Sequence, residues 1–100
     1  MITIQRIREE VAARFDTTLE QIDSKKKVPA LNNARCVAIY LSALAGFKSD
    51  EIGVAFGRSE YSINYSVKAL QSWLDTERAL AEKVETLRLE LGIEKKTLAA

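Results

Sequence analysis

The sequence predicts an all-α domain built from five to six helices. Its 100 residues suit one domain with a modest core. Apolar residues recur at spacings of three and four, the period of a helix face, and no stretch shows the alternation of a strand. Gly46, Gly57 and Gly92 stand where these periodic segments stop. We therefore expect one helical unit over residues 1–93 and a disordered tail over residues 94–100.

Two helices are expected before the first long connection. Residues 2–15 place four apolar side chains on one face, which is typical of an amphipathic helix. The stretch from Asp16 to Thr18 breaks this helix, and Thr17 or Thr18 can cap a short second helix around residues 19–23. The four apolar side chains of the first helix are Ile4, Ile7, Val11 and Phe15.

A basic connector follows, with the sequence SKKKVP over residues 24–29. Its three adjacent lysines, Lys25, Lys26 and Lys27, can contact phosphates through charge alone. The alternative is an exposed loop that only aids solubility.

The third helix is expected over roughly residues 33–45, as the central helix of the core. Its start is open, because Pro29 suits a first turn and Asn32 or Asn33 suits a cap. Arg35 lies near its amino terminus, on a different face from the wide apolar stripe. That stripe comprises Leu31, Ala34, Val37, Ala38, Leu41, Leu44 and Ala45.

Residues 49–68 predict two short helices joined by a tight turn. Ser49 is the expected N-cap, and Asp50 and Glu51 suit the positive end of the helix dipole. Gly57 can end the first helix in the left-handed conformation, and the second helix starts near Ser59.

The apolar and glycine positions of this segment are typical of a helix-turn-helix, whose second helix enters the DNA major groove. Gly53 is expected to let a neighbouring helix approach. From this window alone, an ordinary helical hairpin in a bundle core is an equal alternative. The positions that carry the pattern are Ile52, Gly53, Phe56, Gly57 and Ile63.

Two elements complete the predicted chain. The second helix of the motif continues through Trp73 and Leu74, which we assign to the core, and Asp75 or Thr76 ends it and caps the next helix. The last helix stops at Gly92, followed by Ile93 as an apolar clasp. Its apolar positions are Leu80, Val84, Leu87 and Leu91.

Composition argues against catalysis and against metal or cofactor sites. The chain has no histidine, so the commonest general base is missing, and Cys36 alone makes neither a disulfide nor an ordinary zinc site. The four glycines form no phosphate-binding loop. Cys36 is expected to be a small packing residue or an inert surface thiol.

No long apolar run or signal peptide is present, so we expect a cytoplasmic protein with no membrane partner. The net charge is only +1, but residues 24–68 carry +4 and the remainder carries −3. The positive charge therefore lies in the segment that contains the helix-turn-helix.

The order of these features resembles a known family. ITIQRIREEVAARF opens the chain, a short helix and the lysine loop follow, and then come ARCVAIYLSAL and SDEIGVAFGR. This order is similar to the C-terminal DNA-binding domain of the bacterial chromosomal replication initiator DnaA, a helical domain of the Trp-repressor-like group. The similarity covers about residues 2–92 and is strongest over residues 34–41 and 52–58.

The resemblance implies binding to a short asymmetric double-stranded box. In that family the helix-turn-helix reads the major groove, and an arginine of the basic loop reaches the minor groove. The family's basic loop corresponds to residues 25–33, its helix-opening arginine to Arg35, the loop before the helix-turn-helix to residues 47–49, and the recognition segment to residues 58–68.

The base-reading positions depart from the family pattern. Where the family has GGRDHTT, this chain has GRSEYS over residues 57–62, so the turn is one glycine shorter. The minor-groove arginine falls at about Asn33, unless a loop lysine takes that role. Because each good guanine contact from Arg or Lys is worth about 1–3 kcal/mol, we expect a changed site or weaker specificity.

We expect double-stranded DNA as the partner, in a replication or transcription regulator that has no room for the initiator's ATP-binding motor. A second copy of the chain or a replication protein is a further candidate partner. In this hypothesis Glu60 reads cytosine N4, Asn64 pairs with adenine, and a tyrosine packs on a thymine methyl group. The predicted DNA-binding residues are Lys25, Lys26, Lys27, Asn33, Arg35, Lys48, Ser49, Arg58, Ser59, Glu60, Tyr61, Ser62, Asn64, Tyr65 and Lys68.

The alternative function is a helical protein-interaction module that keeps this scaffold without DNA binding. Glu60 on the recognition face, where phosphates would repel it, and the near-neutral total charge favour that alternative. An exposed second helix would favour DNA binding, and a buried one would favour the interaction module.

Overall fold

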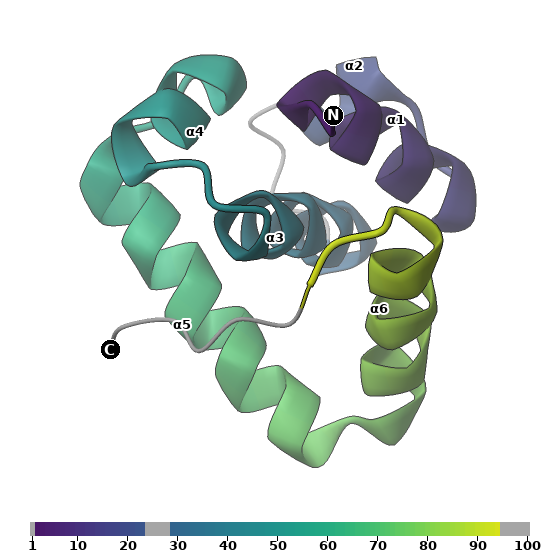
Figure 1. Ribbon diagram of the computed structural model, residues 1–100. Helices are drawn as coiled ribbons and strands as arrows, with labels where there is room; N and C mark the ends of the chain where they lie inside the picture. Colours follow the sequence, from purple (N-terminus) through teal and green to yellow (C-terminus); the bar gives the residue numbers. More distant parts are fainter. Residues whose placement is uncertain (1, 24–28, 95–100) are drawn as a thin grey trace.

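Apolar side chains spaced three or four residues apart fold the described part of the chain into six helices, which confirms the all-α prediction (Figure 1). The computed structural model describes residues 2–23 and 29–94. The helices are α1 (Ile4–Arg14), α2 (Leu19–Asp23), α3 (Pro29–Leu44), α4 (Ser49–Phe56), α5 (Glu60–Thr76) and α6 (Arg78–Glu90).

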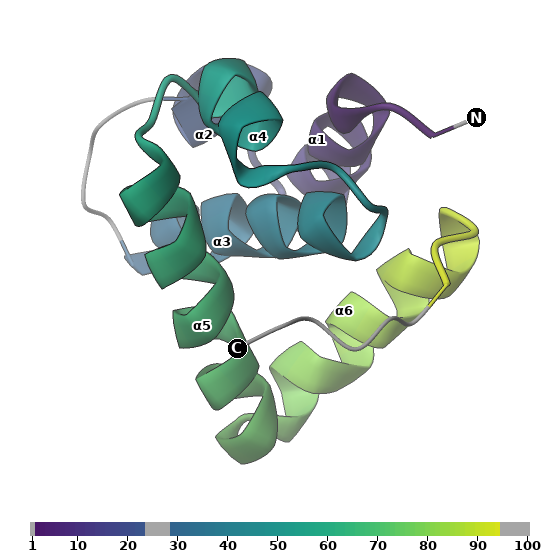
Figure 2. The same ribbon diagram turned by 60° about the vertical axis from the view of Figure 1, so that its left-hand side comes forward.

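Helix α3 is the centre of the fold, as predicted. Figure 1 shows it end-on, and α1, α2, α4 and α5 all pack against it. Every residue from Ala34 to Ser42 is buried. Helix α6 packs against α5, and Figure 2 shows the two helices diverging as a V from their junction near Glu77. The helix-turn-helix formed by α4 and α5 is therefore held against the core helix along one side of the molecule.

Several helix ends follow the sequence signals. The Thr18 hydroxyl accepts a hydrogen bond from the Gln21 amide at 3.1 Å, so Thr18 caps α2. Helix α3 begins at Pro29, which settles the open start in favour of a first-turn proline. Gly92 has a φ of 71°, and the amide of Ile93 donates to the Arg88 carbonyl at 3.0 Å. Ile93 is buried, which confirms the predicted glycine stop with its apolar clasp.

Two predicted caps are wrong. Ser49 is the first residue of α4 and not its N-cap; Lys48 occupies the cap position without a side-chain hydrogen bond. Helix α5 ends at Thr76, as predicted, but the residue that caps α6 is Glu77 and neither Asp75 nor Thr76. The Thr76 hydroxyl donates to the carbonyl of Trp73 at 3.3 Å, so it is engaged within its own helix instead of capping the next one.

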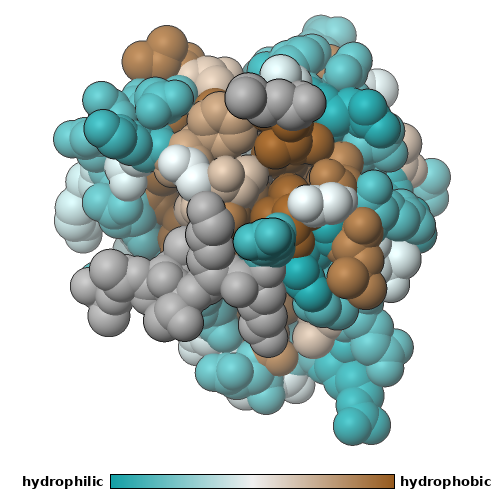
Figure 3. Space-filling model, in the orientation of Figure 1, coloured by the Kyte–Doolittle hydropathy of each residue, from teal (hydrophilic) through white to brown (hydrophobic). Residues whose placement is uncertain are grey.

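The surface combines hydrophobic and hydrophilic regions. On the face where α3 is seen end-on, hydrophobic residues gather near the centre and hydrophilic residues surround them (Figure 3).

Within residues 2–23 and 29–94, no helix has the length and apolar character needed to span a bilayer. The tail predicted to be disordered lies outside the described residues, apart from Glu94.

Cys36 is a packing residue in the interior of α3. Its side chain is 4% exposed, and burial raises the pKa of the thiol, although a hydrogen bond with Ser66 of α5 acts in the opposite direction. Because only the thiolate is a good nucleophile, a buried thiol with a raised pKa is chemically inert.

We expect a thiol reagent at mildly alkaline pH to modify Cys36 only as fast as the protein unfolds locally or globally. The rate should rise to that of an ordinary thiol in denaturant. A Cys36→Ser, Ser72→Cys variant places the thiol at an exposed position of α5 and should react quickly while folded. Equal rates for the two folded proteins would contradict the buried position of Cys36.

Candidate nucleic-acid interface

The turn between α4 and α5 has the geometry of a helix-turn-helix. Gly57 ends α4 with a φ of 64°, in the left-handed region that favours glycine. Ser59 then caps α5, because its hydroxyl accepts from the amide of Ser62 at 3.2 Å. Ile52, Phe56 and Ile63 are buried on the inner side and fix the two helices to the core. These contacts confirm the predicted motif.

Gly53 is required by the turn itself. The amide of Arg58 donates to the Gly53 carbonyl at 2.8 Å, and a Cβ atom on Gly53 would lie 2.6 Å from the carbonyl oxygen of Arg58. The prediction that Gly53 makes room for a neighbouring helix holds only in part, because the amide of Glu60, the first residue of α5, lies 3.9 Å from this Cβ position and the turn lies closer. The close neighbour is the backbone that leads into α5.

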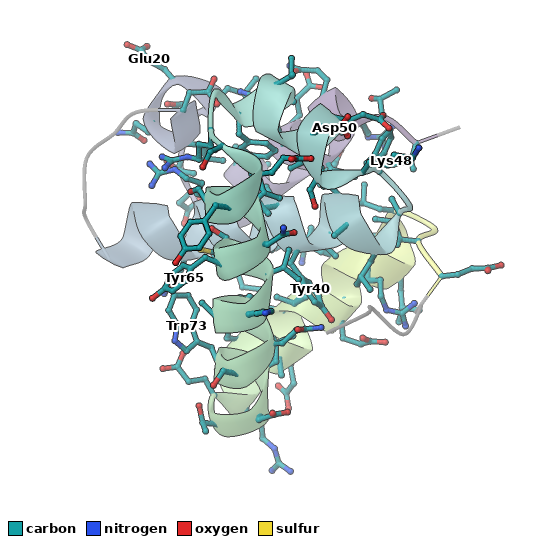
Figure 4. The ribbon with its side chains drawn as sticks, turned by 90° about the vertical axis from the view of Figure 1, so that its left-hand side faces the viewer. Glu20, Tyr40, Lys48, Asp50, Tyr65 and Trp73 are labelled. Carbon is teal, nitrogen blue, oxygen red and sulfur yellow. The ribbon has the colours of Figure 1, made fainter. Side chains whose placement is uncertain are left out.

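The amino-terminal half of α5 presents an exposed face. Ile63 and Leu70 are buried toward the core, whereas Tyr61 is 80% exposed and Tyr65 is 67% exposed. Figure 4 views α5 from outside, with Tyr65 projecting from its free side. Further exposed residues of this face are Glu60, Asn64 and Lys68. The second helix of the motif is thus accessible to a partner, which is the arrangement that DNA binding requires.

The start of α4 borders this exposed face. The Ser49 hydroxyl donates to Oδ1 of Asn64 at 2.8 Å, which links the first residue of α4 to the second turn of α5. Lys48 is exposed immediately before Ser49 and lies on the opposite side of α5 from Tyr65 (Figure 4). The structure therefore brings Ser49 and Asn64 together, with Lys48 next to Ser49 in the chain.

Arg35 is not at the surface where the sequence placed it. Its residue is 5% exposed, and Nε donates to the carbonyl of Ile22 at 2.7 Å, which joins α3 to α2. Burial, followed by the positive charge of Arg58, lowers the pKa of the Arg35 guanidinium. The Arg35 side chain therefore serves the packing of α2 on α3.

Arg58 opens onto a cavity of about 310 Å³ that is also lined by Asp23 and Phe56. Asp23 forms an ion pair with Arg8 of α1, whose guanidinium lies 5.3 Å from the centre of the Phe56 ring. Sequence reasoning missed Arg8 and Asp23, because their pairing depends on how α1 packs on α2 and leaves no local pattern. Arg8, Asp23 and Arg58 therefore form a group with more guanidinium groups than carboxylates.

Of the remaining predicted site residues, some lie outside the described part of the chain and others lie in α3 and α5. Lys25, Lys26 and Lys27 lie outside the described residues. Asn33 is partly buried in the second turn of α3, and Ser62 is partly buried behind the exposed face of α5. In the part of the chain that the structure covers, no group of side chains could hold a metal ion.

Comparison with known proteins decides the relationship. Residues 4–69, which include the whole helix-turn-helix turn, match the sequence model of the family described as bacterial dnaA protein helix-turn-helix. The chain belongs to this DnaA family. The match ends inside α5, at the residue before the buried Leu70.

Individual DnaA proteins are similar over most of this chain. The chromosomal replication initiator protein DnaA of Mesoplasma florum is 28% identical over 93 residues, which cover 91% of this chain and 21% of the relative. Its counterpart from Rickettsia akari is 28% identical over 89 residues, covering 87% and 19%. The Rickettsia massiliae DnaA is 27% identical over 89 residues. This chain spans about a fifth of the length of these relatives.

Proposed function

We propose that this protein binds double-stranded DNA, with the amino-terminal half of α5 in the major groove. The observation that carries the proposal is the exposed face of α5 on a turn that Ile52, Phe56 and Ile63 hold to the core. Membership of the DnaA helix-turn-helix family supports it. A long helix that is fixed on one side and free on the other matches the size of the groove.

Charged residues around this face supply the contacts to phosphates. Lys48, just before α4, and Lys68, within α5, are both exposed, and Arg58 lies at the turn. The loop lysines Lys25, Lys26 and Lys27 add positive charge next to α3 in the sequence. Because these contacts are few, affinity is modest for one copy of the chain, and because they are ionic, affinity falls as salt is raised.

Base reading is assigned to the exposed side chains of α5. Tyr61 and Tyr65 are one helical turn apart, and their rings can pack on thymine methyl groups. Glu60 accepts from cytosine N4. Arg35 is assigned a structural role, because its side chain is buried between α2 and α3.

The biological role that fits this chemistry is regulation of replication or transcription at sites related to initiator boxes. ATP-driven steps of the longer DnaA relatives are not assigned to this chain. Such a regulator acts in the cytoplasm, where bacterial DNA lies. The exposed carboxylate of Glu60 favours the alternative, a helical protein-interaction module on the same scaffold.

A selection from random duplex DNA at two salt concentrations separates these functions. The DNA-binding proposal predicts enrichment of a defined site at low salt and weaker retention at higher salt. An interaction module predicts no retention at either concentration. Failure to hold any duplex at low salt would remove the lead proposal.

Glu60→Gln tests how the acidic residue is used. We expect tighter binding to unrelated duplexes, because a negative charge near phosphates is removed. We also expect loss of about 1–3 kcal/mol of preference for cytosine at one position of the selected site. Binding of wild type and variant to selected and shuffled duplexes measures both effects. Glu77→Gln, at the exposed junction between α5 and α6, is the control and should change neither.

A further inference from the structure

The hydrogen bond between Ser49 and Asn64 crosses from one helix of the motif to the other. The Ser49 Oγ donates to Asn64 Oδ1 at 2.8 Å, and the two residues are fifteen positions apart in the chain. Ser49 is partly buried, whereas Asn64 is exposed on the face of α5 that we place in the groove. The Asn64 side chain is therefore held in one orientation by Ser49 while it stays accessible to a partner.

The bond decides which end of the carboxamide faces outward. An asparagine amide has an acceptor oxygen and an NH₂ group with two donors. The bond turns the oxygen of Asn64 toward Ser49, so the Nδ2 donors are at the end of the amide that faces away from Ser49. Two-point recognition of adenine needs both the oxygen and the nitrogen of the amide. Because the oxygen is turned toward Ser49, we place donation from Nδ2 ahead of the two-point pairing of Asn64 with adenine.

We propose that Ser49 is a positioning residue that turns the Asn64 amide toward acceptor atoms on the edge of a guanine. Guanine is the base that presents two neighbouring acceptors, N7 and O6, in the major groove. This inference rests on the proposed function, because it assumes that α5 lies in the groove. Lys48 supports the placement, since an exposed cation directly before Ser49 can hold the start of α4 at a phosphate.

The reader pair is tested by repeating the duplex selection with Asn64→Ala, Ser49→Ala and Asn64→Asp. Asn64→Ala should lose a guanine preference of about tenfold at one position of the site. Ser49→Ala should relax the preference at that same position and leave the other positions unchanged. A double variant should lose no more than Asn64→Ala alone, because the serine acts through the asparagine.

Asn64→Asp gives the sharpest result. A carboxylate can still accept from the Ser49 hydroxyl, but its outward oxygen accepts where the amide donated. The preferred base at this position should switch from guanine to cytosine, whose N4 group donates. Ser72→Ala, at an exposed position in the distal half of α5, is the matched control and should keep the wild-type site.

The outcomes separate this inference from the proposed function. If the wild type enriches a site and Asn64→Asp keeps guanine, or Ser49→Ala alters a different position, the pair does not read bases together. Retention of no duplex by the wild type contradicts DNA binding itself, and the reader pair with it. Thermal unfolding of each variant shows whether it is folded, and a folded Asn64 or Ser49 variant with wild-type specificity at every position also overturns the inference.

Discussion

Gly53→Ala is expected to destabilise the protein by about 1–3 kcal/mol and to weaken duplex binding beyond the loss of folded protein. The added Cβ would lie 2.6 Å from the carbonyl oxygen of Arg58, and this neighbour is backbone that no rotamer change can move. Alanine is the better helix former by about 1 kcal/mol, which does not compensate for a displaced turn. The start of α5 must shift, and Ser59 and Glu60 shift with it.

Urea unfolding measures the stability of this variant, and titration with the selected duplex measures its binding. Val54→Ala is the control, because Val54 is the next residue of α4 and is 85% exposed. It should change stability by less than about 0.5 kcal/mol. If Gly53→Ala is as stable as Val54→Ala and binds as tightly as the wild type, the close approach at the turn is not a constraint.

Arg35→Ala is expected to cost about 1–3 kcal/mol for the loss of a donor to the buried Ile22 carbonyl. The aliphatic stem of Arg35 is buried as well, so lost packing adds to this cost. Helix α2 should be the element that loosens most, because the hydrogen bond joins it to α3. Urea unfolding gives the total loss, and amide hydrogen exchange in α2 shows where it occurs.

Arg6→Ala provides the comparison for an exposed arginine. Its ion pair with Glu10 lies on the surface of α1, with the Arg6 side chain 61% exposed, so its removal should be nearly neutral. The two roles for Arg35 predict different results. If Arg35 is structural, its replacement lowers stability. If Arg35 binds phosphate, its replacement leaves stability unchanged and lowers only the affinity for DNA.

The helices were predictable from the sequence because each one buries a regular apolar stripe. Apolar residues spaced by three and four predict α1 and α6 without knowledge of the partner helix, because the spacing only requires that one face of each helix is covered. A local capping signal such as Thr18 also keeps its meaning in the fold, because the group that it binds lies three residues away.

Signals that depend on distant residues were misassigned. Ser49 has the chemistry of a cap, but its hydroxyl is used by Asn64, which only the packing of α4 on α5 brings within reach. Arginine is usually exposed. Arg35 can be buried because its guanidinium donates to a carbonyl of α2, which the sequence alone does not place beside it. Gly53 was correctly singled out, but the atom that excludes a side chain belongs to a turn that the sequence does not describe in space.

Chemical-shift mapping with the selected duplex tests the central claim most directly. The amide signals of ¹⁵N-labelled protein are compared before and after DNA is added. We predict the largest changes at Lys48, Glu60, Tyr61, Asn64 and Tyr65, with little change along α6. Changes centred on α6, or none on the exposed face of α5, would contradict the account.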